Sequence, residues 1–344
     1  MNRFEIKGPT FRHSDLKLIG RRINIEKHNN YYLNITKNLK NNFKEFKSKK
    51  YSLVDHDNKN FTGKAGQQFM KRSDVLSKVI QKKIKDKKIK ILDFGCNKGG
   101  LLKKFSKLGY KNLYGYDLGV HYKKFFKDSN IKFIKNLKEK KNYYNLIIFS
   151  HTIAYTDDIE KLIILIKSLL KNDGTLFFNI QDVSKRPLNF FLADQKYHFN
   201  KIMIKNFFGK YGEVKFVKEN FLSHEILFFF KFKKKIKKKN IFVNSNEIKK
   251  AKNLIKKIKR IKNECNILGT NLASAITISI LKKKVKNIVI ENKRSKNYFL
   301  KKKIVSIKEH KKNNIPLLVN FNHQNKNVIE KLKSKYHIKN IIQI

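Results

Sequence analysis

Residues 90–100 read KILDFGCNKGG, an apolar run that ends in a glycine-rich turn. Ile91, Leu92 and Phe94 are typical of a buried strand, and Asp93 places a carboxylate inside it. The glycines predict a tight turn where the backbone can approach a ligand closely. A strand, a glycine-rich turn and a helix N-terminus together predict a nucleotide-binding unit. The expected helix is amphipathic, with its apolar face formed by Leu101, Leu102, Phe105 and Leu108.

The composition indicates a folded and strongly basic chain. Its 344 residues are long for a single hydrophobic core, so we expect more than one domain. The formal charge of +55 favours nucleic acid or an anionic membrane surface as a partner. Only 8 of the 81 basic residues are Arg, however, and Arg is the side chain preferred for bidentate contacts with phosphate and guanine. Lysine, asparagine and isoleucine are abundant together and share A/T-rich codons, so biased genome composition is the alternative source of this charge.

The two cysteines, Cys96 and Cys265, are too few for a disulfide framework or a Cys-based zinc site. We therefore expect a reducing, cytoplasmic location and no bound metal. Residues 1–17 lack the apolar core of a signal peptide, and no run approaches the ~18 apolar residues of a membrane span. The sequence leaves the oligomeric state open.

Changes in sequence character predict three regions. Residues 1–65 are polar and weakly patterned, and only YYLNIT at residues 31–36 is typical of a strand. Residues 66–235 alternate apolar runs with helical patterns, which predicts an α/β domain. The run KFKKKIKKKN at residues 231–240 is interpreted as a solvated boundary, with a basic patch as the alternative. Residues 236–344 are then a smaller, Rossmann-like α/β domain.

The central region has the pattern of a doubly wound parallel sheet. An amphipathic helix is expected at residues 66–84, directly before the glycine-rich strand, and alternating strands and helices follow the glycine turn. The last two strands have no room between them for a crossover helix, so we expect them to pair antiparallel. The strands expected after the first are residues 112–117, 131–134, 146–149, 175–180, 213–217 and 225–232, with helices at 157–170 and 201–211 and a turn at 172–174.

The C-terminal region repeats the arrangement of strand, turn and helix. The turn GTN at residues 269–271 is followed by a helix and by a strand that ends at Glu291. This acid follows the turn glycine after 22 residues, just as Asp117 follows Gly95. A carboxylate at such a place can accept hydrogen bonds from a ribose. The segment has a single glycine, which is poor for a pyrophosphate cradle, so a scaffold without a ligand is the alternative.

Four segments of the central region resemble one family. ILDFGCNKGG, GYDLG, IIFSHT and NDGTLFFNI have the order and spacing of the class I S-adenosylmethionine-dependent methyltransferases, and the resemblance covers roughly residues 67–232. It implies a Rossmann-like, doubly wound sheet that ends in an antiparallel hairpin. It also implies S-adenosylmethionine as the cofactor.

The same resemblance implies roles for individual residues. Asp117 would hold the ribose, Asn136 would contact the adenine ring, and Ser150 would lie beside the methyl group. Asn97 stands where the family usually has glycine; asparagine is the next most tolerant of left-handed backbone angles, so the turn can survive. The implied cofactor-binding positions are Asp93, Gly95, Asn97, Gly99, Asp117, Leu118, Asn136 and Ser150.

The methyl acceptor is less well defined than the cofactor. The fourth strand ends in SHTIAY, without the proline-containing motif that serves adenine or cytosine amino groups, and no Pro-Cys nucleophile is present for cytosine C5. His198, in the loop DQKYHFN after the fifth strand, is a candidate general base near neutral pH, with a packed loop histidine as the alternative. His151 and Tyr155 are further candidates, for which structural roles are the alternative.

A methyltransferase domain followed by a small nucleotide-binding-like domain is similar to the sugar C-methyltransferases. In that family a Tyr-His pair after the fifth strand helps to enolise a ketosugar, which implies a catalytic role for Tyr197 with His198. The family's fuller Tyr-His-Glu-His run and its N-terminal cysteine-rich zinc module are absent from this sequence.

The sequence therefore predicts an S-adenosylmethionine-dependent methyltransferase. Its expected acceptor is a small or glycan-linked molecule, such as a nucleotide sugar in surface-polysaccharide biosynthesis. The alternatives are an RNA methyltransferase that uses the lysine-rich surface, and a catalytically degenerate methyltransferase fold that serves as a binding module.

Overall fold

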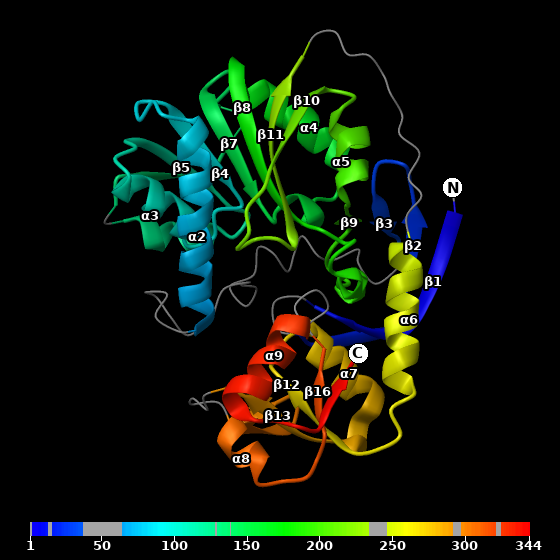
Figure 1. Cartoon of the computed structure of the whole chain (residues 1–344). Coiled ribbons are helices and arrows are strands. Elements are labelled where there is room, and N and C mark those ends of the chain that lie inside the picture. Colours follow the sequence, from blue (N-terminus) through cyan, green and yellow to red (C-terminus); the bar gives the residue numbers. More distant parts are fainter. Residues whose placement is uncertain are drawn as a thin grey trace. The chain divides into compact units, whose positions relative to one another are not determined.

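The structure, a computed structural model, describes residues 2–12, 16–36, 64–127, 129–137, 139–233, 246–291, 297–320 and 325–344. They form two compact units, which interleave along the chain (Figure 1). Unit 1 comprises Glu26–Asp182 and Asp194–Val243, and unit 2 comprises Asn2–Ile25, Val183–Ala193 and Asn244–Ile344. The expected domain boundary at residues 235–236 lies outside the described residues, and the boundary at residue 65 stays a prediction.

Unit 1 is built on a seven-stranded sheet in the order β10-β11-β8-β7-β4-β5-β6. The strands from β4 to β8 pair in parallel, whereas β11 pairs antiparallel with both β8 and β10. The expected doubly wound sheet with a terminal antiparallel hairpin is therefore confirmed. Its strands are β4 (Lys90–Phe94), β5 (Asn112–Tyr116), β6 (Ile131–Ile134), β7 (Tyr144–Ser150), β8 (Leu170–Gln181), β10 (Gly212–Val217) and β11 (Glu225–Phe232).

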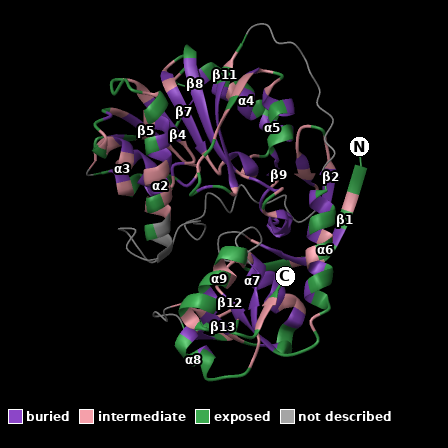
Figure 2. Ribbon diagram, viewed as in Figure 1, coloured by how far each residue is buried: buried purple, intermediate pink, exposed green. Residues whose placement is uncertain are grey.

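Helices α2 (Lys64–Lys83) and α3 (Gly100–Lys107) bury their apolar sides on one face of this sheet. Ile80 and Phe105 belong to the same buried cluster as Ile148 of β7. In Figure 2 the strands are mostly buried while the outer sides of the helices are exposed, as expected for amphipathic helices that cover a sheet. The other helical elements of unit 1 are η2 (Val120–Phe126), η3 (Ile153–Tyr155), α4 (Ile159–Leu169) and α5 (Lys201–Phe208).

A row of aromatic rings crosses the middle of the sheet. Phe149 of β7 stacks on Phe178 of β8 with ring centroids 5.0 Å apart, and Phe178 stacks on Phe228 of β11 at 4.8 Å. Phe94 of β4 extends the row by stacking on Phe149 at 4.9 Å. Phe178 is the direct cross-strand partner of both neighbours, so these pairs stabilise one register of the strands. The same register places the residues that follow Phe94, Phe149 and Phe178 along one edge of the sheet, where the antiparallel strand β11 begins.

Strand β8 begins earlier than the sequence predicts. Residues 172–174 were expected to form a turn before the strand, but β8 runs without interruption from Leu170 to Gln181. Pairing with β7 is irregular here, because Tyr144 pairs with Leu170 and Leu146 pairs with Thr175. Two steps along β7 thus correspond to five along β8, and the extra residues bulge out of the ladder. The turn-forming residues are accommodated in this bulge instead of ending the strand.

The region before residue 65 supplies strands to the structure. The strand predicted at residues 31–36 is confirmed as β3 (Tyr32–Asn34), which pairs antiparallel with β9 (Tyr197–His198) in unit 1. Two further strands, β1 (Asn2–Phe11) and β2 (Leu18–Lys27), were not predicted. Within unit 2, β1 lies against α6 and α7, and Gly8 approaches the Phe191 ring so closely that a Cβ would meet it at 2.6 Å.

Unit 2 contains a second, mostly parallel sheet in the order β14-β15-β13-β12-β16-β17. Only β14 pairs antiparallel in the strand pairs described for this sheet. This arrangement agrees with the additional α/β region expected near the C-terminus. Its elements are η4 (Pro187–Phe191), α6 (Glu247–Lys259), β12 (Cys265–Leu268), α7 (Leu272–Leu281), η5 (Lys282–Lys284), β13 (Val285–Ile290), β14 (Tyr298–Phe299), β15 (Lys302–Ser306), α8 (Ile307–Lys311), β16 (Leu317–Val319), α9 (Asn325–Tyr336) and β17 (Ile341–Gln343).

Within the described part of the chain, no helix combines the length and the apolar character needed to cross a membrane.

The aromatic row generates a stability prediction. Replacing Phe178 by Ala removes a fully buried ring from the centre of the sheet, so we expect the free energy of unfolding to fall by about 3–5 kcal/mol in urea titrations. Phe221→Ala is the matched control because that ring is 43% exposed, and we expect it to change stability by less than about 1 kcal/mol. Equal losses for the two variants would contradict a central role for the row.

Candidate functional site

The glycine-rich turn after β4 has the geometry of a ligand-binding turn. Gly95 has φ +85° and its N–H donates to the Tyr116 carbonyl at 2.7 Å, which joins the turn to the end of β5. A Cβ on Gly95 would lie 2.4 Å from Thr152 Oγ1, and a Cβ on Gly99 would lie 2.4 Å from the Phe126 ring. Both positions therefore require glycine for two reasons, the positive φ and the lack of space.

Asn97 occupies a left-handed backbone position inside the glycine-rich turn. Its φ is +49°, and its side-chain Oδ1 accepts a hydrogen bond from the Lys98 N–H at 2.7 Å. Its own N–H donates to the Asp117 carboxylate at 2.9 Å. Asparagine is thus compatible with this backbone, since a short polar side chain can bond locally in the left-handed region.

Asp117 connects the end of β5 to the glycine turn. One carboxylate oxygen accepts from the Asn97 N–H, and the other accepts from the Gly119 N–H at 2.8 Å. Burial raises the pKa of this carboxyl group, and these two backbone donors oppose that rise. Each oxygen keeps acceptor capacity, because a carboxylate oxygen can accept more than one hydrogen bond. The group is therefore held rigidly at the carboxyl edge of the sheet.

Asp93 is a buried acid with an unsatisfied oxygen. It is 3% exposed, and its Oδ1 has no hydrogen-bond partner in the described part of the chain. Burial, with the nearby Asp117 charge, raises the pKa of Asp93 to about 7, and Arg72 acts in the opposite direction. A buried acceptor without a donor is costly and is expected where a ligand supplies the missing donor. Asp93 therefore fits a site for a cationic or hydrogen-donating ligand.

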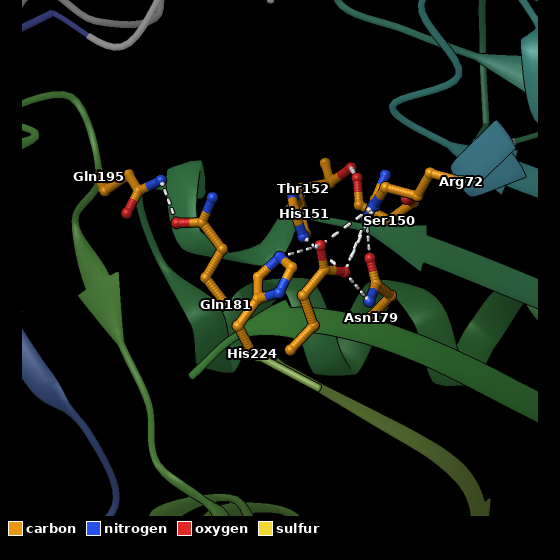
Figure 3. Close-up of polar contacts among 9 residues, drawn as sticks. Arg72, Ser150, His151, Thr152, Asn179, Gln181, Gln195 and His224 are labelled. Carbon is orange, nitrogen blue, oxygen red and sulfur yellow. Dashed lines mark hydrogen bonds and ion pairs between the residues drawn. The ribbon is translucent and has the colours of Figure 1, made fainter. Parts of the chain in front are cut away.

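A second polar cluster lies at the same edge, around the Glu225 carboxylate. Figure 3 labels the residues that contact this carboxylate, which are Arg72, His151, Asn179 and His224. Glu225 begins β11 and pairs with Gln181 at the end of β8. Arg72 of α2 forms an ion pair with it at 3.2 Å, and His151 forms another at 3.1 Å. Asn179 donates to the same carboxylate from β8. Arg72 and His151 hold the pKa of Glu225 well below its usual range, against the opposing effect of burial.

His151 has an unusual backbone conformation at the end of β7. Its φ is +62°, and its N–H donates to the Asn179 carbonyl at 2.8 Å. A left-handed conformation costs a non-glycine residue roughly 1–2 kcal/mol, and such residues concentrate at functional sites. The next residue, Thr152, donates from its hydroxyl to the Phe94 carbonyl at 2.9 Å. The segment 151–152 therefore joins the glycine turn to the cluster around Glu225.

Two further residues of the predicted acceptor loop lie on β9 and are buried. Tyr197 donates from its hydroxyl to the Asp157 carbonyl at 3.3 Å, near the start of α4, and burial raises its pKa to about 12. His198 is 4% exposed, and burial lowers its pKa to about 3. The catalytic roles expected for this pair stay predictions, as do the roles of the other candidate residues.

The remaining predicted positions are spread along the same edge. Ser150 ends β7 and is half-buried, and Leu118 is half-buried beside Asp117. Asn136 follows β6, is exposed, and donates to Glu139 at 2.7 Å. Asp117 is hydrogen-bonded to the glycine turn, and its charge acts on Asp93. Asn136, in contrast, is hydrogen-bonded within its own loop.

Several residues of the cluster were missed by the sequence analysis. Arg72 and Glu225 are 153 positions apart, so no local pattern connects them. A weak signal exists for Glu225, because an acid at the head of the apolar run EILFFF is unusual in a buried strand. Farther along the edge, Gln195 donates to Gln181 Oε1 at 3.2 Å and to the Tyr155 hydroxyl at 3.0 Å.

The corresponding turn in unit 2 differs from the one in unit 1. Gly269 has φ +84°, and Asn271 caps α7 by accepting from the Ser274 N–H at 2.9 Å. Glu291, in the place that Asp117 takes in unit 1, accepts hydrogen bonds from Lys331 and Tyr336 of α9. Glu291 is therefore hydrogen-bonded to helix α9 of its own unit and not to the backbone of the turn at Gly269.

A family model described as a methyltransferase domain matches residues 66–205. This segment contains the glycine turn, Asp93, Asp117 and His151. The match covers less than half of the chain and shows that this segment is similar to a methyltransferase domain. No curated protein matches the chain.

Similar solved structures include three that cover about half of this chain. The PH0226 protein from Pyrococcus horikoshii OT3 is 17% identical with a TM-score of 0.42, covering 51% of this chain and 94% of that one. A SAM-dependent methyltransferase from Archaeoglobus fulgidus is 16% identical with a TM-score of 0.38, covering 48% and 98%. The plantazolicin methyltransferase BpumL, solved with a monoazolic desmethylPZN analogue and SAH, is 15% identical with a TM-score of 0.38, covering 48% and 84%.

The raised pKa of Asp93 generates a pH-dependent prediction. In the unfolded chain an Asp loses its proton near pH 4, whereas folded Asp93 keeps its proton up to about pH 7. The contribution of Asp93 to the free energy of unfolding is therefore fully present below pH 4. As the pH rises to 7 this contribution is lost, and the loss is on the order of 4 kcal/mol. Asp93→Asn does not titrate, so we expect it to be more stable than wild type at pH 8, with the advantage shrinking toward pH 4.

Urea unfolding at pH 4.5 and pH 8 measures this difference. Asp173→Asn is the matched control, since that carboxylate is exposed in the same unit. A pH-independent difference between Asp93→Asn and wild type would show that Asp93 is ionised throughout this range.

Proposed function

We propose that this chain transfers the methyl group of S-adenosylmethionine to a small or glycan-linked acceptor, with nucleotide sugars of surface-polysaccharide biosynthesis as the first candidates. The observation that carries the methyl-transfer part is the juxtaposition of a glycine turn with Asp93 and Asp117 at the carboxyl edge of a matched methyltransferase domain. In doubly wound sheets, ligands bind at this edge, near the point where the strand order reverses. Here the order reverses between β4 and β7.

The residues at this edge fit the cofactor. Gly95 and Gly99 leave the backbone open where a Cβ would collide, and Asp117 has acceptor capacity for the ribose hydroxyls. Asp93 provides a buried acceptor for a cationic ligand, which S-adenosylmethionine is. Bound there, the cofactor supplies an electrophilic methyl group. Leu118, Asn136 and Ser150 complete the proposed cofactor side.

The acceptor side of the proposal rests on the polar groups around Glu225. His151, Asn179 and Gln181 come from the ends of neighbouring strands, and Gln195 reaches Gln181 (Figure 3). Amide and imidazole groups bind hydroxyls through paired donor and acceptor hydrogen bonds. A site lined by such groups suits a hydroxyl-rich molecule better than an apolar one. This supports a sugar-like acceptor.

A methyl transfer to a hydroxyl, amine or carbon acid also needs a group that removes a proton. His198 and Tyr197 were the first candidates, and they stay predictions. An imidazole with a pKa near 3 is a weak base, and a phenol with a pKa near 12 is seldom ionised at neutral pH. His151 lies at the end of β7, where its side chain is 20% exposed. We therefore take His151 as the proton acceptor in this proposal.

Calorimetry with S-adenosylmethionine tests the cofactor side. We expect wild type to bind and Asp117→Ala to bind at least 10-fold more weakly, because two charge-assisted hydrogen bonds to the ribose are lost. Asp173→Ala is the control, because that carboxylate is exposed and away from the turn. Binding that is equal in all three proteins would contradict the ribose role, and no binding by wild type would contradict the proposed function.

Incubation with methyl-labelled S-adenosylmethionine tests the acceptor side. A panel of nucleotide-activated sugars is compared with total RNA at equal protein concentration, and we expect label in the sugar fraction only. Label in RNA alone, together with an affinity for RNA that falls steeply as the salt concentration rises, would show that the acceptor is RNA and not a sugar. No label in any fraction, despite cofactor binding, would favour the degenerate binding module.

A further inference from the structure

Arg72 reaches the candidate site from α2 and is fixed there by two neighbouring strands (Figure 3). Its Nε lies 3.3 Å from both oxygens of Glu225, which begins β11, and its Nη2 lies 3.2 Å from Glu225 Oε2. Nη2 also donates to Asn179 Oδ1 on β8, and Asn179 donates in turn to the Glu225 carboxylate. The three side chains close a ring of hydrogen bonds, which holds the guanidinium in one orientation.

These contacts use one edge of the guanidinium. The group carries five N–H donors in a planar fork, and the contacts described for Arg72 engage its Nε and its Nη2. Nη1 has no acceptor within the described part of the chain, and it is not buried. Because 17% of the Arg72 side chain is exposed, against 3% for Glu225, the guanidinium presents oriented donors at the surface of the site.

A second cation of α2 approaches the same segment. Lys71 precedes Arg72, is exposed, and holds its Nζ 4.8 Å from the centre of the Phe221 ring. Phe221 belongs to the turn that leads into Glu225, and its N–H donates to Glu219 Oε1 at 3.2 Å within that turn. Lys71 and Arg72 therefore both reach the segment from residue 221 to residue 225.

The charges around Arg72 are compatible with a bound anion. Glu225 is the acid that contacts it, and the same carboxylate lies 3.1 Å from His151 Nε2 and 3.5 Å from His224 Nε2. Asp93 interacts with Arg72 electrostatically, but burial raises the pKa of Asp93 to about 7, so this acid is not fully ionised at neutral pH. One carboxylate thus faces a guanidinium and two imidazoles, and an added anion meets no excess of negative charge.

We propose that Arg72, with Lys71 beside it, binds an anionic group of the methyl acceptor, so that the acceptor is a phosphate- or carboxylate-bearing sugar and not a neutral one. The inference rests on the proposed function, because it concerns the acceptor of that same transfer. An oxyanion on Nη1 receives a charge-assisted hydrogen bond from a group that is already ordered, so little entropy is lost on binding. Since Arg72 contacts Glu225 and interacts with Asp93, this anion holds the acceptor beside the cofactor side of the site.

Arginine suits this position better than lysine, the common cation of the chain. Only 8 of the 81 basic residues are Arg. A lysine could neutralise Glu225, but its single ammonium cannot bind Glu225 and Asn179 through one planar edge and keep further donors in a fixed direction. The use of arginine at position 72 therefore agrees with a group that binds on two sides.

Calorimetry with the full chain and S-adenosylhomocysteine tests the proposal with three sugar probes. UDP-glucose carries a diphosphate, glucuronate carries a carboxylate, and methyl glucoside carries no charge. We expect wild type to bind at least one charged probe at least 10-fold more tightly than methyl glucoside, and that probe identifies the source of the anion. Arg72→Lys keeps a positive charge opposite Glu225 but lacks the Nη1 donors, so we expect it to bind this probe at least 10-fold more weakly.

Matched variants are needed because a formal charge of +55 attracts anions at many places. We expect Lys71→Ala to weaken probe binding about 2- to 5-fold, and Lys82→Ala, an exposed lysine about three turns later on α2, to leave it unchanged. The double variant Arg72→Met/Glu225→Gln removes both members of the ion pair, leaves no unpaired buried charge, and binds the probe as weakly as Arg72→Lys.

Two results overturn the proposal. One is equal binding of charged and neutral probes by wild type. The other is equal binding of the charged probe by wild type, Arg72→Lys and the double variant, when circular dichroism shows that all three are folded. Equal effects of Lys71→Ala and Lys82→Ala overturn the part assigned to Lys71.

A kinetic arm uses any acceptor that the sugar panel identifies. We expect Arg72→Lys to raise KM for that acceptor at least 10-fold with kcat changed less than about threefold, because binding energy is lost equally in the ground state and the transition state. Methylation of a neutral sugar with a KM that Arg72→Lys leaves unchanged overturns the proposal. Probe binding that depends on Arg72, in a protein that transfers no methyl group to any acceptor, supports the anion site and counts against the proposed function.

Discussion

Parallel pairing of β4 with β5 and with β7 is the constraint on which the rest of unit 1 depends. Because parallel strands end at the same edge, Asp93, Asp117 and His151 lie at one edge of the sheet although 58 positions separate the first from the last. Each lies at or just beyond the end of its strand, where the hydrogen-bond ladder stops and side chains can face a ligand. The aromatic row from Phe94 to Phe228 crosses four of the strands and stabilises their register directly behind this edge. A one-residue slip would turn each of these side chains to the opposite face.

The fold of unit 1 was predictable because its signals are local. Apolar runs, the glycines after Asp93 and the absence of a crossover between the last two strands are all visible within short windows. The left-handed turn at Asn97 was also predictable, since the side chain and the spacing to Asp117 suit it. Strands β1 and β2 were missed because polar and charged residues interrupt their apolar positions, so the alternation is weak. What orders β1 is packing against α6 and α7, which lie more than 200 positions later in the chain.

The cluster around Glu225 shows the other limit of local reasoning. Arg72, Asn179 and Glu225 belong to a helix, a parallel strand and an antiparallel strand, and their contacts exist only once the sheet has its full strand order.

The contacts of Glu291 were equally invisible in the sequence, although its spacing from Gly269 matches the spacing in unit 1. In sequence the two acids look equivalent, but Asp117 receives backbone donors of its own turn while Glu291 receives side chains of α9. The spacing from the turn glycine therefore does not tell whether such a carboxylate is bonded by the backbone of its turn or by side chains of a distant helix.

The bulge in β8 has a consequence for how this domain can vary in length. Residues 171–174 leave the ladder with β7 near the start of the strand, while pairing from Thr175 onward is regular up to Asn179. Additions or deletions before Thr175 therefore change the size of the bulge and leave the register of Phe178 untouched. Relatives of this domain can in this way diverge at the amino-terminal edge of the sheet while the opposite edge, with its histidine and its acids, keeps its geometry.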